Sequence, residues 1–186
     1  MYKYVTNLLS HIFIDNGYSF AVARVYMEVG EVDPNGAQTI INARAGGMSY
    51  VDGYIYPCLD CGNPAQQVID TVNYLQQAGA NYGMLWFDIE GSWSDDVDTN
   101  INFIQGLIDQ ANAMGVHWGI YTSYSQWGPI TSNTDRFGAP PLWYAHYDGD
   151  PSFDDFSPFG GWSKPSIKQY DGDVDFCGAS LDKNAY

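Results

Sequence analysis

Basic residues are scarce in this 186-residue chain. It has 7 Lys and Arg residues against 22 Asp and Glu residues, which gives a formal net charge of −15 at pH 7. A chain this acidic is repelled by the phosphates of nucleic acids and by anionic membrane surfaces. We therefore expect neither a nucleic acid nor a membrane as a partner.

Long hydrophobic runs are also lacking. No apolar stretch approaches the ~20 residues that a membrane-spanning helix needs. The first ten residues contain one Lys and one Leu-Leu pair, with no small-residue cleavage site. They therefore make a poor signal peptide.

The sequence contains no signature of a nucleotide or metal site. The pair Gly46-Gly47 follows a predicted helix, whereas a phosphate-binding loop precedes one. A G-x-S-x-G elbow for a serine nucleophile is absent. His11, His117 and His146 are scattered without metal-ligand spacing, and we expect the last two to be packed in strands. We predict no metal and no cofactor.

Cysteine is rare, with three residues in all. Cys58 and Cys61 have C-x-x-C spacing, and Cys177 lies far away. A zinc site needs a second pair or nearby His ligands, and a thioredoxin-like motif needs to open a helix directly after a strand. Because Pro57 precedes the pair and Gly62 follows it, we favour a small loop disulfide between Cys58 and Cys61. A reduced, inert pair is the alternative.

Apolar periodicity divides the chain from Tyr18 onward into alternating strands and helices. This alternation is typical of parallel strands joined by right-handed crossovers. We predict one domain over 1–186, with an α/β fold that is an irregular TIM-like barrel whose last strands lack full helices. Residues 1–15 are an atypical N-terminal segment, with one helix predicted over Tyr4 to Phe13. The predicted strands are 18–26, 48–56, 83–90, 116–121, 142–147, 166–170 and about 176–181, and the predicted helices are 34–45, 64–78, 97–111 and 124–130.

The strand that ends in Asp88 and Glu90 carries the strongest functional signal. Successive side chains of a strand point to opposite faces, so these two acids share a face. Carboxylates are costly to desolvate, so acids kept at the mouth of a buried strand indicate a function. The alternative is a strand end that has simply reached water.

Glycoside hydrolysis is the reaction that uses such a pair. One carboxylic acid protonates the leaving oxygen, and a second carboxylate assists at the anomeric carbon. Cα atoms two residues apart on a strand are about 6.5 Å apart. That spacing keeps the two carboxyl groups close enough to favour retention of configuration.

Aromatic residues make up 16% of the chain, and they recur at the predicted strand ends. In parallel barrels the functional groups lie at the C-terminal ends of the strands. An acidic pair, a further acid and a ring of aromatics suit a carbohydrate better than a phosphate or a metal ion. Besides Asp88 and Glu90, these end residues are Tyr26, Tyr56, Tyr121, Tyr147, Tyr170 and Asp182.

Several motifs together resemble glycoside hydrolase family 25, the Chalaropsis-type lysozymes, and are most similar to the eukaryotic branch found in amoebae and nematodes. The resemblance covers about residues 16–186. The motifs are Trp86-Phe87-Asp88-Ile89-Glu90, Gly119-Ile120-Tyr121-Thr122, Pro141-Leu142-Trp143-Tyr144-Ala145, Phe159-Gly160-Gly161-Trp162-Ser163-Lys164-Pro165 and Ser180-Leu181-Asp182-Lys183-Asn184-Ala185-Tyr186.

The resemblance implies hydrolysis of the β-1,4 bond between N-acetylmuramic acid and N-acetylglucosamine in bacterial peptidoglycan. It implies that Glu90 is the general acid. It implies that Asp88 supports either the substrate's acetamido group or the positively charged transition state. It further implies a secreted, lysosomal or phagosomal enzyme, which we expect to be a monomer. The residues that match those bordering the substrate in the family are Asp182, Tyr121, Tyr56 and Trp143.

One departure from the family pattern concerns the N-terminus. Family members begin with a strand that carries an Asp-Val-Ser-like segment, and nothing before Tyr18 matches it. We expect the first strand to be missing or replaced, as in a truncated or degenerate homologue. A non-catalytic peptidoglycan-binding module is the alternative function. A chitinase with a D-x-x-D-x-D-x-E motif is disfavoured, because Trp86 stands where that motif needs an aspartate.

The net charge of −15 also predicts a dependence on pH. Peptidoglycan is itself anionic, so it is repelled by this chain at neutral pH. Protonation of carboxylates in an acid compartment relieves the repulsion. We expect an acidic optimum of activity.

Overall fold

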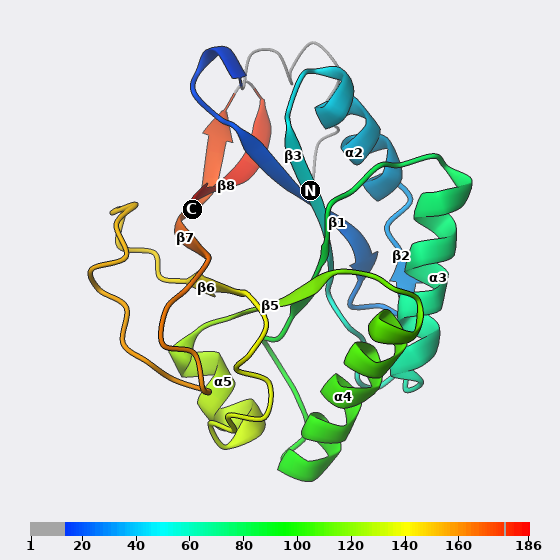
Figure 1. Ribbon diagram of the computed structural model, residues 1–186, viewed down its shortest axis with the longest axis vertical. Coiled ribbons are helices and arrows are strands. Elements are labelled where there is room, and N and C mark those ends of the chain that lie inside the picture. Colours follow the sequence, from blue (N-terminus) through cyan, green and yellow to red (C-terminus); the bar gives the residue numbers. More distant parts are fainter. Residues whose placement is uncertain (1–13, 177) are drawn as a thin grey trace.

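A computed structural model describes residues 14–176 and 178–186. Its strands curl around a common centre, with α2, α3 and α4 stacked outside them (Figure 1). The elements are β1 (Phe20–Met27), β2 (Glu31–Val32), α2 (Gly36–Ala45), β3 (Tyr50–Ile55), α3 (Pro64–Gln77), β4 (Leu85–Asp88), α4 (Val97–Ala113), β5 (Trp118–Thr122), α5 (Tyr124–Thr131), β6 (Leu142–Ala145), β7 (Ile167–Phe176) and β8 (Ala179–Ala185).

The strands form one eight-stranded sheet in the order β2-β1-β3-β4-β5-β6-β7-β8. Neighbours from β1 through β7 are parallel, and four helices serve as crossovers between them. No helix lies between β6 and β7, as expected from the loss of helical periodicity there. The α/β class and the barrel-like curl are confirmed. Within the described residues the curl is a half-barrel, because no ladder joins β8 to β1.

The predicted strands differ from the observed ones in two respects. The short strand β2, which pairs antiparallel with the end of β1, was not predicted. The last two strands are longer than expected and form an antiparallel hairpin. The sequence does not show the full length of these strands, because Asp171 and Asp173 lie where the register shifts. Asp173 also has a positive φ of 56°. Bulges of this kind interrupt the alternation on which strand prediction depends.

The N-terminal predictions lie outside the described residues. They are the helix over Tyr4 to Phe13 and the missing first strand. Among the described residues, β1 is the first strand of the sheet.

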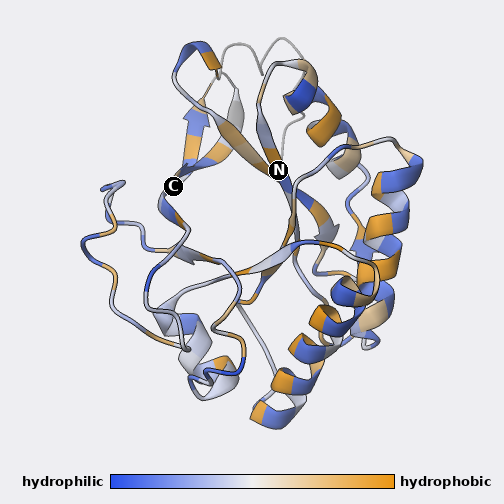
Figure 2. Ribbon diagram, viewed as in Figure 1, coloured by the Kyte–Doolittle hydropathy of each residue, from blue (hydrophilic) through white to orange (hydrophobic). Residues whose placement is uncertain are grey.

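Helices α3 and α4 begin where their capping residues predict. The Asn63 side chain accepts a hydrogen bond from Gln66 N at 3.3 Å, and Pro64 occupies the first turn of α3. The Asp96 side chain accepts from Asp98 N at 3.3 Å at the start of α4. Such caps satisfy backbone N–H groups that have no partner within the helix. Figure 2 shows hydrophobic and hydrophilic residues alternating along both helices, as in helices that cover a sheet on one side.

The sheet has a hydrophobic core on each face. The larger core packs the helices against the outer face, and the smaller one fills the inside of the curl with Trp86, Tyr121, Trp143 and Ile167. Gly119 makes room for the inner core, since a Cβ atom there would lie 2.5 Å from the Trp86 ring. Below this layer, Asp52 accepts hydrogen bonds from Trp86 Nε1 and Met84 N, each at 3.0 Å. The inner core is therefore a packed layer of side chains inside the curl of the sheet.

Residues 14–176 and 178–186 include no helix that is both long enough and apolar enough to cross a membrane.

Candidate active site

A cavity of about 1000 Å³ runs along β1, between α2 and β8, and reaches the C-terminal ends of β3, β4 and β5. All six predicted site residues line it: Asp88, Glu90, Asp182, Tyr121, Tyr56 and Trp143. Tyr147 and Tyr170 also line the cavity. Tyr26, another predicted strand end, does not, because its side chain is buried in the outer core.

Asp88 is the last residue of β4 and is 6% exposed. Its Oδ1 atom is buried without a hydrogen-bond partner among the described residues. Burial raises the pKa of Asp88 well above its usual value, and the nearby charges of Glu90 and Glu28 raise it further. Glu28, in the turn after β1, also lines the cavity and was missed by the sequence analysis. Burial and the neighbouring negative charges therefore both oppose ionisation of Asp88.

Glu90 lies two residues beyond Asp88 and is half-buried. Burial raises its pKa, and the charge of Asp182 across the cavity adds to the effect. A carboxylic acid with a raised pKa keeps its proton nearer to neutral pH, as a general acid must. Asp88 and Glu90 thus form a coupled pair of carboxyl groups in one cavity.

The backbone beyond β4 is fixed on both sides of Glu90. Ile89 N donates to Tyr121 O at 2.8 Å, and Ile89 O accepts from Thr122 Oγ1 at 2.7 Å. Glu90 O accepts from Trp93 Nε1 at 3.0 Å. These bonds tie the segment to β5 and hold the Glu90 side chain over the cavity.

The opposite wall of the cavity is a hydrogen-bonded group centred on Gln169 of β7. Gln169 Oε1 accepts from the hydroxyl groups of Tyr121 and Tyr147, each at 2.6 Å, and Gln169 Nε2 donates to Asp182 Oδ2 at 3.0 Å. The sequence analysis missed Gln169. The available signal was the alternation of β7, which places Gln169 on the same face as Ile167 of the inner core.

Two aromatic side chains complete the wall. Trp143 of β6 packs edge-on against Tyr121 with ring centroids 4.6 Å apart, and its Nε1 donates to Asn184 Oδ1 at 2.8 Å. Tyr56 follows β3, and its hydroxyl lies 3.5 Å from Glu90 O. Aromatic rings beside acids are the surface on which sugar rings pack.

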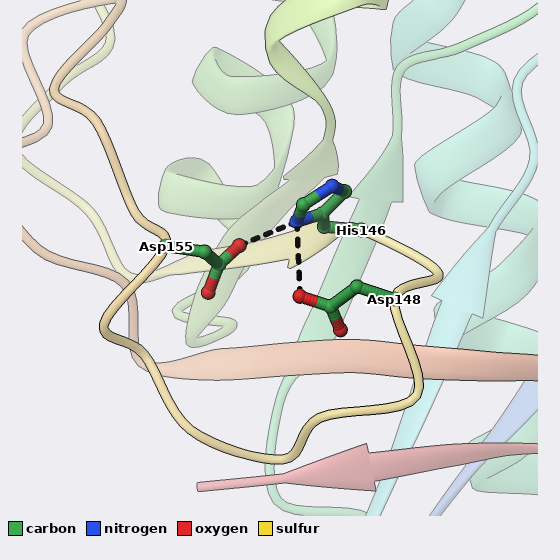
Figure 3. A group of neighbouring side chains, drawn as sticks. All are labelled: His146, Asp148 and Asp155. Atoms are coloured by element: carbon green, nitrogen blue, oxygen red, sulfur yellow. Dashed lines mark hydrogen bonds and ion pairs between the residues drawn. The ribbon is translucent and has the colours of Figure 1, made fainter.

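His146, Asp148 and Asp155 gather outside the cavity (Figure 3). His117 and His146 were expected to be packed strand histidines, and both predictions were wrong. His117 is exposed just before β5. The His146 side chain is 55% exposed, and its Nδ1 lies 2.5 Å from Asp155 Oδ2. The ammonium group of Lys168, fully buried, lies 2.8 Å from both Asp148 Oδ2 and Asp155 Oδ1. Burial opposes charge on Asp155, but the hydrogen bonds from Lys168, Tyr144 and His146 and the charge of Lys168 together outweigh it, and the pKa of Asp155 falls well below its usual value. This cluster anchors the loop between β6 and β7.

The structure joins Cys58 and Cys61 in a disulfide. The bond lies between β3 and α3, and Cys61 packs against Gly30 in the turn that connects β1 to β2. The disulfide thereby braces two loops at the same end of the sheet as the cavity. Cys177 lies outside the described residues.

Coupled carboxyl groups at the end of a parallel strand, in a cavity walled by aromatic rings, define a glycoside hydrolase by class. The family model described as "Lysozyme-like protein 1" matches residues 3–170. The "Probable GH family 25 lysozyme 2" of Dictyostelium discoideum is 52% identical over 172 residues, which cover 91% of this chain and 81% of that protein. "Lysozyme-like protein 5" of Caenorhabditis elegans is 41% identical over 174 residues, which cover 90% of this chain and 80% of that protein. The chain belongs to the family 25 lysozymes.

Solved structures share the fold at lower identity. The spore cortex lytic enzyme SleM of Clostridium perfringens is similar with a TM-score of 0.72 and 21% identity, over 93% of this chain and 61% of that one. The catalytic domain of endolysin ply40, from bacteriophage P40 of Listeria monocytogenes, is similar with a TM-score of 0.71 and 21% identity, over 95% of this chain and 85% of that one. The half-barrel is therefore the fold of known cell-wall lytic enzymes.

Proposed function

We propose that this chain hydrolyses the β-1,4 bond between N-acetylmuramic acid and N-acetylglucosamine in bacterial peptidoglycan. The observation that carries the proposal is the coupled pair Asp88 and Glu90 in the cavity of about 1000 Å³. Both carboxyl groups have raised pKa values, so one proton stays available to the leaving oxygen.

Glu90 acts as the general acid in this proposal. It is the more exposed of the two acids, so it is the one that reaches a glycosidic oxygen in the cavity. Asp88 is buried beneath it and assists, either by orienting the substrate's acetamido group or by stabilising the positive charge of the transition state. The short span between neighbouring same-face strand positions favours retention.

Asp182, Tyr121, Tyr56 and Trp143 bind the sugar in the proposed complex, since all four line the same cavity. We also propose a secreted, lysosomal or phagosomal location, which the Cys58–Cys61 disulfide supports because disulfides persist in oxidising compartments. The proposed active form is a monomer.

The test is release of soluble muropeptides from purified peptidoglycan at about pH 5, close to where carboxyl groups titrate. The Glu90→Gln variant keeps the side chain's size and removes its acidic proton. We expect its activity to fall by about 10²–10⁴-fold, the usual contribution of general acid–base catalysis. Glu31→Gln is the matched control, because Glu31 is exposed on β2 outside the cavity, and it should retain full activity.

The same assay separates the enzyme from a binding module. A module that only binds peptidoglycan would retain fragments without releasing muropeptides, and Glu90→Gln would leave its affinity unchanged. Absence of release by the folded wild-type chain would overturn the proposed function.

A further inference from the structure

The amide of Gln169 makes three hydrogen bonds at the wall of the cavity, and its residue is 4% exposed. A carboxylate only accepts hydrogen bonds, so the Asp182 contact at 3.0 Å orients the Gln169 NH₂ group toward Asp182. The carbonyl oxygen then faces Tyr121 and Tyr147, so both hydroxyl groups must donate to it. One side chain therefore determines that Asp182 accepts a hydrogen bond and that the hydroxyl groups of Tyr121 and Tyr147 both donate one.

The four residues of this group come from different parts of the sheet. Tyr121 belongs to β5, Tyr147 follows β6, Gln169 belongs to β7 and Asp182 belongs to β8. Gln169 is itself held by the sheet, because its backbone carbonyl oxygen accepts a hydrogen bond from His146 N at 2.9 Å. The side-chain amide of Gln169 therefore connects the end of β5, the segment after β6 and the strand β8 at the wall of the cavity.

We propose that Gln169 is a positioning residue of the hydrolytic site: its NH₂ group holds the Asp182 carboxyl group in place at the cavity, while its side-chain carbonyl oxygen turns both tyrosine hydroxyl protons away from Asp88 and Glu90. The inference rests on the proposed function.

The electrostatics of the cavity support this role. The pKa of Asp182 is raised overall, because partial burial and the charges of Asp173 and Asp171 outweigh the hydrogen bond from Asp173 N to Asp182 Oδ1, which lowers it. A second donor on Oδ2 acts in the same direction as the first. The Asp182 charge in turn helps to raise the pKa of Glu90. Other described groups that face the network are Asp88, Glu28, Asp171, Asp173, Lys183, Tyr121 and Tyr147.

The test compares the pH profiles of muropeptide release by wild type, Gln169→Glu and Gln169→Met. A protonated carboxyl group has the shape of the amide, so Gln169→Glu can still donate to Asp182 and accept from both tyrosines. Once that introduced group ionises, it repels Asp182 and donates nothing. We expect a turnover number close to wild type at acid pH and a basic limb shifted to lower pH. Gln169→Met makes none of the three bonds, and we expect its turnover number to fall about tenfold to a hundredfold at every pH.

Gln105→Glu is the matched control, because it adds the same group on α4, where Gln105 bonds to Asp109. It should reproduce the wild-type profile. A Gln169→Glu profile that coincides with wild type, or one that is lowered equally at every pH in a folded protein, overturns this inference. If the wild type releases nothing, the proposed function fails and this inference fails with it; an active wild type with an unshifted Gln169→Glu variant defeats this inference alone.

Discussion

Asp88 lies in an environment that disfavours the ionised form of its carboxyl group. It is buried, its Oδ1 atom is without a partner among the described residues, and its pKa is raised by burial and by Glu90 and Glu28. The folded state therefore binds this proton more tightly than the unfolded chain does. Stability is greatest below the unfolded pKa of an aspartate, about 3.9, and falls as the pH rises toward the folded pKa.

Asp88→Asn should therefore stabilise the protein at pH 7 while impairing hydrolysis. The gain in the free energy of unfolding is about 1.4 kcal/mol for each unit by which folding raises the pKa. Each kcal/mol corresponds to about 3 °C in the unfolding midpoint for a chain of this size. Thermal unfolding at about pH 7 and about pH 3 measures the effect, which should vanish at the lower pH because Asp88 is then neutral in both states.

Asp154→Asn is the control for this measurement, because Asp154 is an exposed loop residue that does not line the cavity. Its midpoint should match wild type at both pH values. Equal midpoints for wild type and Asp88→Asn at pH 7 would show that burial of the Asp88 carboxylate costs no stability.

At the scale of elements, β5 approaches its neighbours closely because of Gly119. A Cβ atom at this position would lie 2.5 Å from the Trp86 ring and 2.9 Å from Pro141 O. Pro141 O also accepts from Ile120 N at 3.1 Å in the pairing of β5 with β6. The small residue thus couples the inner core to the register of the strands that carry Tyr121 and Trp143.

Gly119→Ala should destabilise the fold by about 1–3 kcal/mol, because overpacking displaces a buried ring or a strand. Gly128→Ala is the matched control: Gly128 lies within α5 with no atom inside 4 Å of its built Cβ, and alanine favours helix by up to about 1 kcal/mol. Urea denaturation measures both variants. A Gly119→Ala variant as stable as Gly128→Ala would contradict this account of the inner core.

At the scale of the whole molecule, the net charge of −15 acts on the polyanionic substrate. Three of the seven Lys and Arg residues are paired with acids: Arg24 with Asp33 and Glu28, Lys168 with Asp148 and Asp155, and Lys183 with Asp171. Positive charge is therefore not concentrated to attract substrate carboxylates. Repulsion weakens when carboxyl groups are protonated or when salt screens them.

We therefore expect the rate of muropeptide release to be highest at acid pH. At pH 7 the rate should rise as ionic strength increases from about 0.01 M to about 0.1 M, which shortens the screening length from about 30 Å to about 10 Å. Near the acid optimum the same change in salt should have less effect. Initial rates over a pH series at both ionic strengths measure this. Highest turnover at neutral pH and low salt would contradict it.

The sequence by itself determined the features that depend on local periodicity. The alternation of a strand predicts that Asp88 and Glu90 share a face, although β4 itself ends at Asp88. The caps Asn63 and Asp96 mark their helices because a cap bonds to residues two or three positions away. Strands alternating with helices also imply parallel pairing, which brings Tyr56 and Tyr121 to one cavity.

Only the tertiary structure decided which polar groups meet across the cavity. Gln169 contacts Tyr121 at a separation of 48 residues and Tyr147 at a separation of 22, and both contacts depend on how tightly the sheet curls. Burial likewise depends on the assembled fold: it placed Lys168 between two aspartates and Tyr26 in the outer core. The pKa shifts of Asp88 and Glu90 follow from the same burial, because desolvation is a property of the packed molecule and not of the local sequence.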